Sequence, residues 1–94
     1  MKLLDRGVLK SFAAKHRLAG PKLNNWELAV SKATWEKFAD IRQTFRSADL
    51  VGPNVVFDVG SNRIVTTVNF VVQSVRIKRV LTHAEYERLD IAKL

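Results

Sequence analysis

The segment Val55–Leu81 reads VVFDVGSNRIVTTVNFVVQSVRIKRVL, and over much of it apolar residues recur at every second position. This two-residue period is typical of β-strands that bury one face. It predicts strands at 55–59, 63–72 and 74–81. Gly60-Ser61-Asn62 forms the first turn, and Gln73-Ser74 forms the second, tight connection. Because both connections are short, the three strands should form an antiparallel meander.

The alternation also predicts which side chains share a face. Val55, Phe57 and Val59 share one face of the first strand. The second strand has Ile64, Thr66, Val68 and Phe70 on one side and Arg63, Val65, Thr67 and Asn69 on the other. The third has Val75 and Ile77 on one side and Arg76, Lys78 and Val80 on the other. One sheet face is therefore expected to pack on a core, and the other to hold basic side chains in a groove.

The first half of the chain has a helical period instead. Apolar residues spaced by four, with His16 on the same stripe, predict an amphipathic helix over 3–18 that Gly20-Pro21 ends. A second helix is predicted over 21–33, with Pro21 in its first turn. Residues 34–45 can be read as one helix or as a loop followed by a short helix.

Helices followed by strands predict an α+β fold, with the N-terminal helices packed on one face of a small antiparallel sheet. The 94 residues suffice for one two-layer core, so we predict a single domain over 1–94. Thr82 and Glu85 have the spacing of a capping box, which predicts a short C-terminal helix. Trp26 and Trp35 are expected in the core. His16 is expected to be structural.

The chain is basic, with a formal net charge of +7 and a pI near 10.3. A basic surface concentrates polyanions and speeds encounter with them, so nucleic acid is the expected partner. The absence of Cys excludes disulfides, thiolate zinc sites and a cysteine nucleophile, and it fits a reducing, cytoplasmic compartment. No apolar run has the length of a membrane span, so we expect no membrane partner.

The residues from Val75 to Asp90 combine fixed cations with groups that can transfer protons. Arg76, Lys78 and Arg79 precede His83 and Tyr86 within this short segment. Such a set can bind a phosphodiester and move protons around it.

The chain also resembles a known family. The pattern Val56-Phe57, Gly60-Ser61-Asn62-Arg63, Val68-Asn69-Phe70, Ile77-Lys78 and Thr82-His83-Ala84-Glu85-Tyr86 is similar to the HigB branch of the RelE-type toxins from bacterial type II toxin-antitoxin systems. The resemblance spans nearly the whole chain, and the T-H-x-E-Y ending is its most specific element. It implies an mRNA interferase, a small α+β endoribonuclease that usually cuts mRNA on the translating ribosome. It also implies inhibition by a HigA-like antitoxin with a helix-turn-helix domain, through which alone operator DNA would be contacted.

The chain departs from the family pattern at three positions. Lys78 stands where relatives often have Arg, Leu81 where many have Gly, and Thr67 where several have Lys or another residue. Lysine keeps the charge but lacks the planar fork that fits a phosphate, so contact at position 78 would be weaker or differently placed.

RNA cleavage by side chains alone needs a base for the 2′-hydroxyl, cations for the phosphate and an acid for the departing 5′-oxygen. We predict catalytic roles for Arg63, Lys78, His83 and Tyr86. His83 and Tyr86 could exchange the roles of base and acid. RNA contacts are predicted from Asn62, Asn69, Arg76 and Arg79.

Each of these residues also has a simpler interpretation. A lone His near a strand end is more often a hydrogen-bonded structural residue, and Arg76 and Arg79 can be solvated charges on an edge strand. A non-catalytic basic RNA- or DNA-binding module on the same fold is therefore the alternative function, and an inactive partner-binding protein is a weaker third. Two separated His without Cys do not predict a metal site, and four scattered Gly do not form a phosphate-binding loop, so no cofactor is expected.

Overall fold

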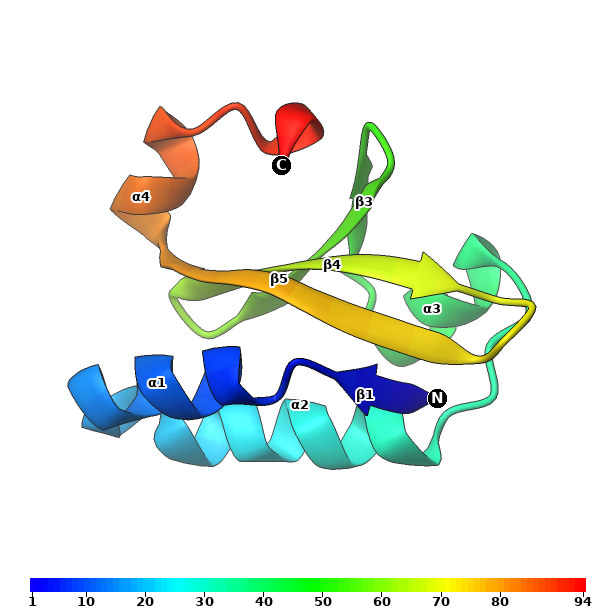
Figure 1. The fold of residues 1–94 in the computed structure, drawn as a ribbon, viewed down its shortest axis with the longest axis horizontal. Helices are drawn as coiled ribbons and strands as arrows, with labels where there is room; N and C mark the ends of the chain where they lie inside the picture. Colours follow the sequence, from blue (N-terminus) through cyan, green and yellow to red (C-terminus); the bar gives the residue numbers. More distant parts are fainter.

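A five-stranded sheet organises the chain in this computed structural model, which describes residues 1–94. The strands are β1 (Lys2–Leu4), β2 (Asp49–Val51), β3 (Asn54–Val59), β4 (Asn62–Asn69) and β5 (Ser74–Thr82), in the spatial order β1-β5-β4-β3-β2. The helices are α1 (Gly7–Lys15), α2 (Gly20–Lys32), α3 (Phe38–Thr44) and α4 (His83–Arg88), with 3-10 turns η1 (Arg17–Ala19) and η2 (Ile91–Lys93). The α+β prediction is confirmed, since α1 and α2 lie along one side of the sheet and α4 is a short C-terminal helix (Figure 1).

The core explains why the sheet and helices pack together. Buried side chains of α1 and α2 meet one face of β3, β4 and β5 in a single cluster. Phe57, fully buried in β3, contacts Trp26, Trp35 and Phe45, with ring centroids 5.3–6.1 Å apart. The prediction that both tryptophans are core residues is confirmed, because Trp26 and Trp35 are 2% and 3% exposed.

The predicted first helix was wrong at its start. Lys2–Leu4 form a strand that pairs in parallel with β5, and Asp5 then takes a φ of 64°, which no helix contains. Helix α1 begins only at Gly7 and ends at Lys15. Leu3 is buried in the core from its strand position, whereas Leu4, the first residue of the predicted helical stripe, is only partly buried.

The structure also differs from the prediction in β2 and in the end of β4, and it decides between the two alternatives for residues 34–45. Strand β2 was not predicted and forms the edge beside β3. Residues 34–45 adopt the second of the two alternatives, an irregular segment followed by the short helix α3. The predicted strand over 63–72 ends at Asn69, whose Oδ1 accepts hydrogen bonds from the amides of Val71 and Val72 and so forms the turn to β5.

The prediction of which side chains share a sheet face is confirmed for most of the sheet but was wrong at Val80. The β4–β5 pairing joins Thr66 to Ile77 and then Val65 to Arg79, so Lys78 is an extra, bulged residue. One inserted residue reverses the alternation beyond it. Val80 therefore enters the helix-facing core, and Leu81 joins the opposite face.

The second sheet face is partly covered rather than free. Val56, Val65 and Leu81 pack there against Ile91, with Tyr86 and Leu94 at the margin. The C-terminal segment lies on the opposite side of the sheet from α1 and α2 (Figure 1). Asn54, fully buried, anchors this segment by donating its amide N–H to the Ile91 carbonyl oxygen at 2.8 Å.

Candidate active site

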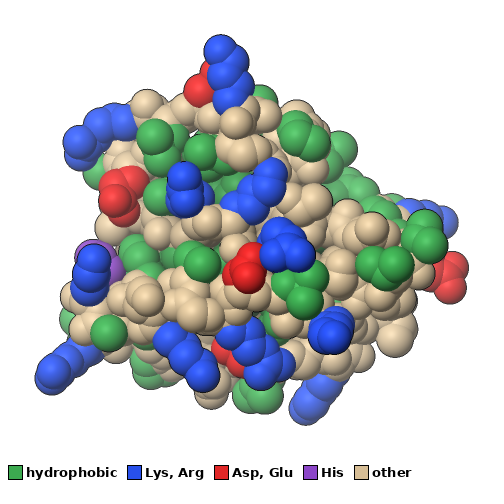
Figure 2. Space-filling model, in the orientation of Figure 1, with side chains coloured by type: hydrophobic (Ala, Val, Ile, Leu, Met, Phe, Trp, Pro, Cys, Tyr) green, Lys and Arg blue, Asp and Glu red, His purple; other side chains and the backbone are tan.

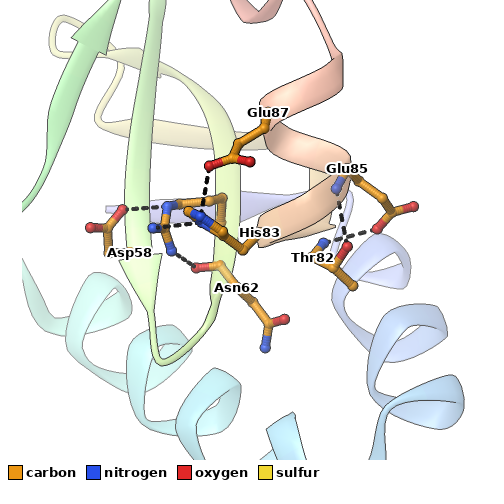
Figure 3. Close-up of polar contacts among 7 residues, drawn as sticks. Asp58, Asn62, Thr82, His83, Glu85 and Glu87 are labelled. Carbon is orange, nitrogen blue, oxygen red and sulfur yellow. Dashed lines mark hydrogen bonds and ion pairs between the residues drawn. The ribbon is translucent and has the colours of Figure 1, made fainter.

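Arg63 is the centre of a polar network beside the β3–β4 turn. Its Nε lies 3.0 Å from Asp58 Oδ1, its Nη1 donates to the Asn62 carbonyl oxygen at 3.1 Å, and its Nη2 lies 3.2 Å from His83 Nδ1. Figure 3 shows this network running from Asp58 to His83 and on to Glu87. These contacts use three of the five guanidinium N–H donors, so two remain for a ligand.

The contacts of His83 fix the position of its proton. A guanidinium can only donate, so His83 Nδ1 must accept from Arg63. The proton of the neutral ring is then on Nε2, which lies 2.9 Å from Glu87 Oε1. The imidazole is thus oriented at both nitrogens while its side chain stays 55% exposed. It can reach a ligand in solvent, and release from Arg63 would free its lone pair.

Tyr86 also lies near Arg63, whose Cζ is 5.7 Å from the centre of the phenol ring. Both residues line a shallow pocket with Asp49, Asp58 and Arg42. Partial burial, assisted by the charge of Asp49, raises the pKa of Tyr86 above its ordinary value. The phenol therefore remains protonated at neutral pH, which suits a proton or hydrogen-bond donor better than a base.

The short helix α4 is what presents His83 and Tyr86 together. Thr82 Oγ1 accepts from the Glu85 amide at 3.2 Å, and Glu85 Oε1 accepts from the Thr82 amide at 2.9 Å, so the predicted capping box is confirmed (Figure 3). Hydrogen bonding by Thr82, first through its backbone N–H and then through its side chain, lowers the pKa of Glu85, which keeps the carboxylate ionised. A structural role for Glu85 accounts for this geometry.

Thr82→Ala should destabilise the protein by about 1 kcal/mol, because the first turn of α4 loses its cap. For a domain of this size the melting temperature should fall by about 4–8 °C. Thermal unfolding followed by circular dichroism measures this. Ser31→Ala is the matched control, since its hydroxyl donates to the Glu27 carbonyl within α2 and caps nothing. Equal melting temperatures for Thr82→Ala and Ser31→Ala would contradict the prediction.

The structure places Lys78 apart from this network. Its Nζ donates to Asn54 Oδ1 at 2.9 Å and to the Leu94 carbonyl oxygen at 2.8 Å. In β5 it lies three residues before Leu81, the strand partner of Arg63, which corresponds to about 10 Å. Arg76 and Arg79 line a cleft with Lys78, and Arg76 is paired with Asp5 at 2.6 Å.

The two asparagines predicted to contact RNA lie at opposite ends of β4, about 23 Å apart along the strand. Asn62 adjoins Arg63 and His83, whereas Asn69 closes the turn to β5. The structure therefore brings together Arg63, His83, Tyr86 and Asn62. It does not bring Lys78, Arg76, Arg79 or Asn69 into the same cluster.

Four neighbours of this cluster were not predicted. Glu87 could have been found from its i,i+4 spacing to His83 on a helix. Asp58 could have been found as the residue opposite Arg63 across the hairpin. Arg42 and Asp49 come from α3 and β2, and no spacing in the sequence connects them to Arg63.

The model of the HigB toxin family, described as the RelE-like toxic component of a toxin-antitoxin system, matches residues 19–89. The match includes the hairpin with Arg63 and the start of α4 with His83 and Tyr86. This chain belongs to the HigB toxin family. No curated protein sequence matches it at a significant level.

Membership in the HigB family makes the chain the toxin of a toxin-antitoxin pair, so an antitoxin is its partner. The family match is consistent with the fold, in which helices cover one face of a mostly antiparallel sheet. None of the helices is long and apolar enough to cross a membrane. His, Asp and Glu side chains nowhere form a group of three or more that could hold a metal ion.

Proposed function

We propose that this toxin is an mRNA interferase that cleaves mRNA, on the translating ribosome, by acid-base catalysis with its own side chains. The proposal rests on one observation. A half-exposed imidazole is oriented at both nitrogens, next to a guanidinium with two free donors and a phenol. A HigA-like helix-turn-helix antitoxin would neutralise the toxin, and operator DNA would be contacted only through that antitoxin.

Arg63 is the residue that binds the scissile phosphate in this mechanism. Asp58 and the Asn62 carbonyl hold its guanidinium in place, so its remaining donors are positioned before the ligand arrives. A phosphate that attracts the guanidinium also competes with its bond to His83. Substrate binding would thereby free the lone pair of His83 Nδ1.

The proton transfers then follow from the two neighbouring side chains. His83 Nδ1 takes the proton of the 2′-hydroxyl, and the 2′-oxygen forms a bond to phosphorus. The bond from phosphorus to the 5′-oxygen breaks, and Tyr86 donates its phenolic proton to the leaving oxygen. The products are a 2′,3′-cyclic phosphate and a 5′-hydroxyl. The carboxylate of Glu87 stabilises the imidazolium that forms, as an orienting group does for a catalytic histidine.

The other predicted RNA contacts have subordinate places in this proposal. Lys78, predicted as a catalytic residue, lies about 10 Å along β5 from the partner of Arg63, so in this proposal it would contact a neighbouring phosphodiester rather than the scissile one. Arg79 and Arg76 lie beside it and would add salt-dependent contacts to the strand. Asn62 would contact RNA next to Arg63.

A substrate with a single 2′-deoxy sugar at the scissile position should bind normally and resist cleavage, because the attacking hydroxyl is missing. The matched all-ribose mRNA should be cut and leave a 2′,3′-cyclic phosphate. The measurement is mapping of transcript ends after incubation of each mRNA with the toxin and translating ribosomes. Induction of the toxin alone should arrest growth, and co-expression of the antitoxin should relieve the arrest.

Cleavage of the 2′-deoxy substrate would exclude the proposed reaction. Binding of RNA without cleavage of either substrate, and growth arrest without cut transcripts, would identify the non-catalytic binding module instead.

A further inference from the structure

A basic cleft lies on the helix side of the candidate active site, between the α1–α2 connection and the β3–β4 turn. It has a volume of about 540 Å³ and is lined by Lys15, His16, Arg17, Lys22 and Asn62, among others. None of its lining residues is Asp or Glu. None of its three fixed cations forms an ion pair, whereas Arg6, Arg63 and Arg76 are each paired with a carboxylate. We refer to this site as the basic cleft.

One of these cations, Lys22, lies directly against the β3–β4 turn. Gly60 has a φ of 62°, and a Cβ built at this position would lie 3.1 Å from Lys22 Cδ. The turn therefore passes directly against the stem of Lys22, whose ammonium lies beside Gly60 at the wall of the cleft. Helix α2 begins here with no side-chain cap and no acidic residue in its first turn, so its positive end adds to the field.

Asn62 connects the basic cleft to the active site. Its carbonyl oxygen accepts from Arg63, while its side-chain amide points away from His83, toward the helices (Figure 3). The same residue lines the cleft. A strand bound at Arg63 could therefore continue past Asn62 into the cleft, whose own lining contains no carboxylate. Figure 2 shows Lys and Arg side chains spread over the face in view, with only scattered acidic ones between them.

We propose that the basic cleft binds a backbone phosphodiester of the same single-stranded RNA whose neighbouring phosphate lies at Arg63. This inference rests on the proposed function for the identity of the RNA strand, but the cleft itself would act by phosphate binding alone. Its role is to hold the substrate on one side of the scissile bond. Contacts of this kind set affinity and register without reading sequence.

The test compares two triple variants with the same change of charge. Lys15→Gln, Arg17→Gln and Lys22→Gln remove the cleft cations and keep polar side chains of similar length. Lys10→Gln, Lys32→Gln and Lys37→Gln remove three exposed cations that line no cleft near the site. Binding of a short single-stranded 2′-O-methyl RNA is measured by fluorescence anisotropy over a series of salt concentrations. This RNA lacks the attacking hydroxyl, so cleavage cannot affect the result.

The cleft variant should bind about tenfold more weakly than the unchanged protein, and its slope of log K against log salt should be shallower by about 2. In the control variant, the loss of affinity and the decrease in the salt slope should each be less than half as large. Circular dichroism should give the same fold for all three proteins. Equal losses in the two variants, or no loss in the cleft variant, would overturn the inference.

Failure of the proposed nuclease function would be seen in a cleavage assay, not in the binding measurement. An all-ribose mRNA that the unchanged protein never cuts would exclude the nuclease. The anisotropy comparison would still decide whether the basic cleft binds phosphodiesters.

Discussion

His83→Ala is expected to slow RNA cleavage by about 10²–10⁴-fold, the usual contribution of a positioned acid or base. The side chain is 55% exposed and forms no part of either hydrophobic cluster, so its removal should not disturb folding. Induction of the variant should therefore leave growth unaffected. Single-turnover cleavage and colony counts measure the two effects, and thermal unfolding checks the fold.

Arg88→Ala is the control for this variant, because Arg88 is an exposed residue of the same helix and forms no ion pair. It should remain toxic and cleave RNA. Glu87→Gln should give an intermediate loss of rate, since glutamine can still accept from His83 Nε2 but carries no charge to stabilise an imidazolium. A folded His83→Ala protein that remains toxic would remove His83 from the mechanism.

Much of the fold follows from local patterns in the sequence. Strand β4 and the capping box at Thr82 were predictable because alternation and capping each depend on residues a few positions apart. Strand β1 was not, because three residues are too few to distinguish a two-residue period from a helical one. It exists because pairing with β5 buries Leu3, and that partner lies about seventy residues away in the chain.

The bulge at Lys78 shows a second limit of the sequence pattern. Alternation carried through β5 places Val80 with Arg76 and Lys78, and only the pairing with β4 reveals the inserted residue. The bulge brings Leu81 onto the face covered by the C-terminal segment. It thus decides how β5 leads into Thr82 and α4, which carries the candidate site residues His83 and Tyr86.

Part of the candidate site could also be predicted, because some of its residues lie close together in the sequence or beside a turn. His83 and Tyr86 lie three residues apart on α4, and Arg63 is adjacent to a recognisable turn. Lys78 was grouped with them because it is basic and close in sequence, but its ammonium is bound by Asn54 and Leu94. Asn54 has no sequence signal of its own, since its role depends on a C-terminal segment almost forty residues further on.

Arg63→Ala is expected to slow cleavage by about 10²–10³-fold, the usual cost of removing one donor that stabilises charge in the transition state. The loss should appear mainly in the single-turnover rate rather than in RNA affinity. Arg79→Ala is the matched control, because it removes one exposed cation of the same sheet that contacts neither His83 nor a buried group. It should affect affinity and its salt dependence more than the rate.

The contact between Arg63 Nη2 and His83 Nδ1 also predicts how the effects of the two substitutions on the cleavage rate combine. If the two side chains act as one unit, the double variant Arg63→Ala, His83→Ala should be only slightly slower than His83→Ala alone. Independent residues would instead multiply their effects, to about 10⁴-fold or more. The same cycle with Arg79→Ala in place of Arg63→Ala should be close to multiplicative, because Arg79 lies outside the network. Multiplicative effects in the Arg63–His83 cycle would contradict a mechanism in which phosphate binding at Arg63 frees the lone pair of His83.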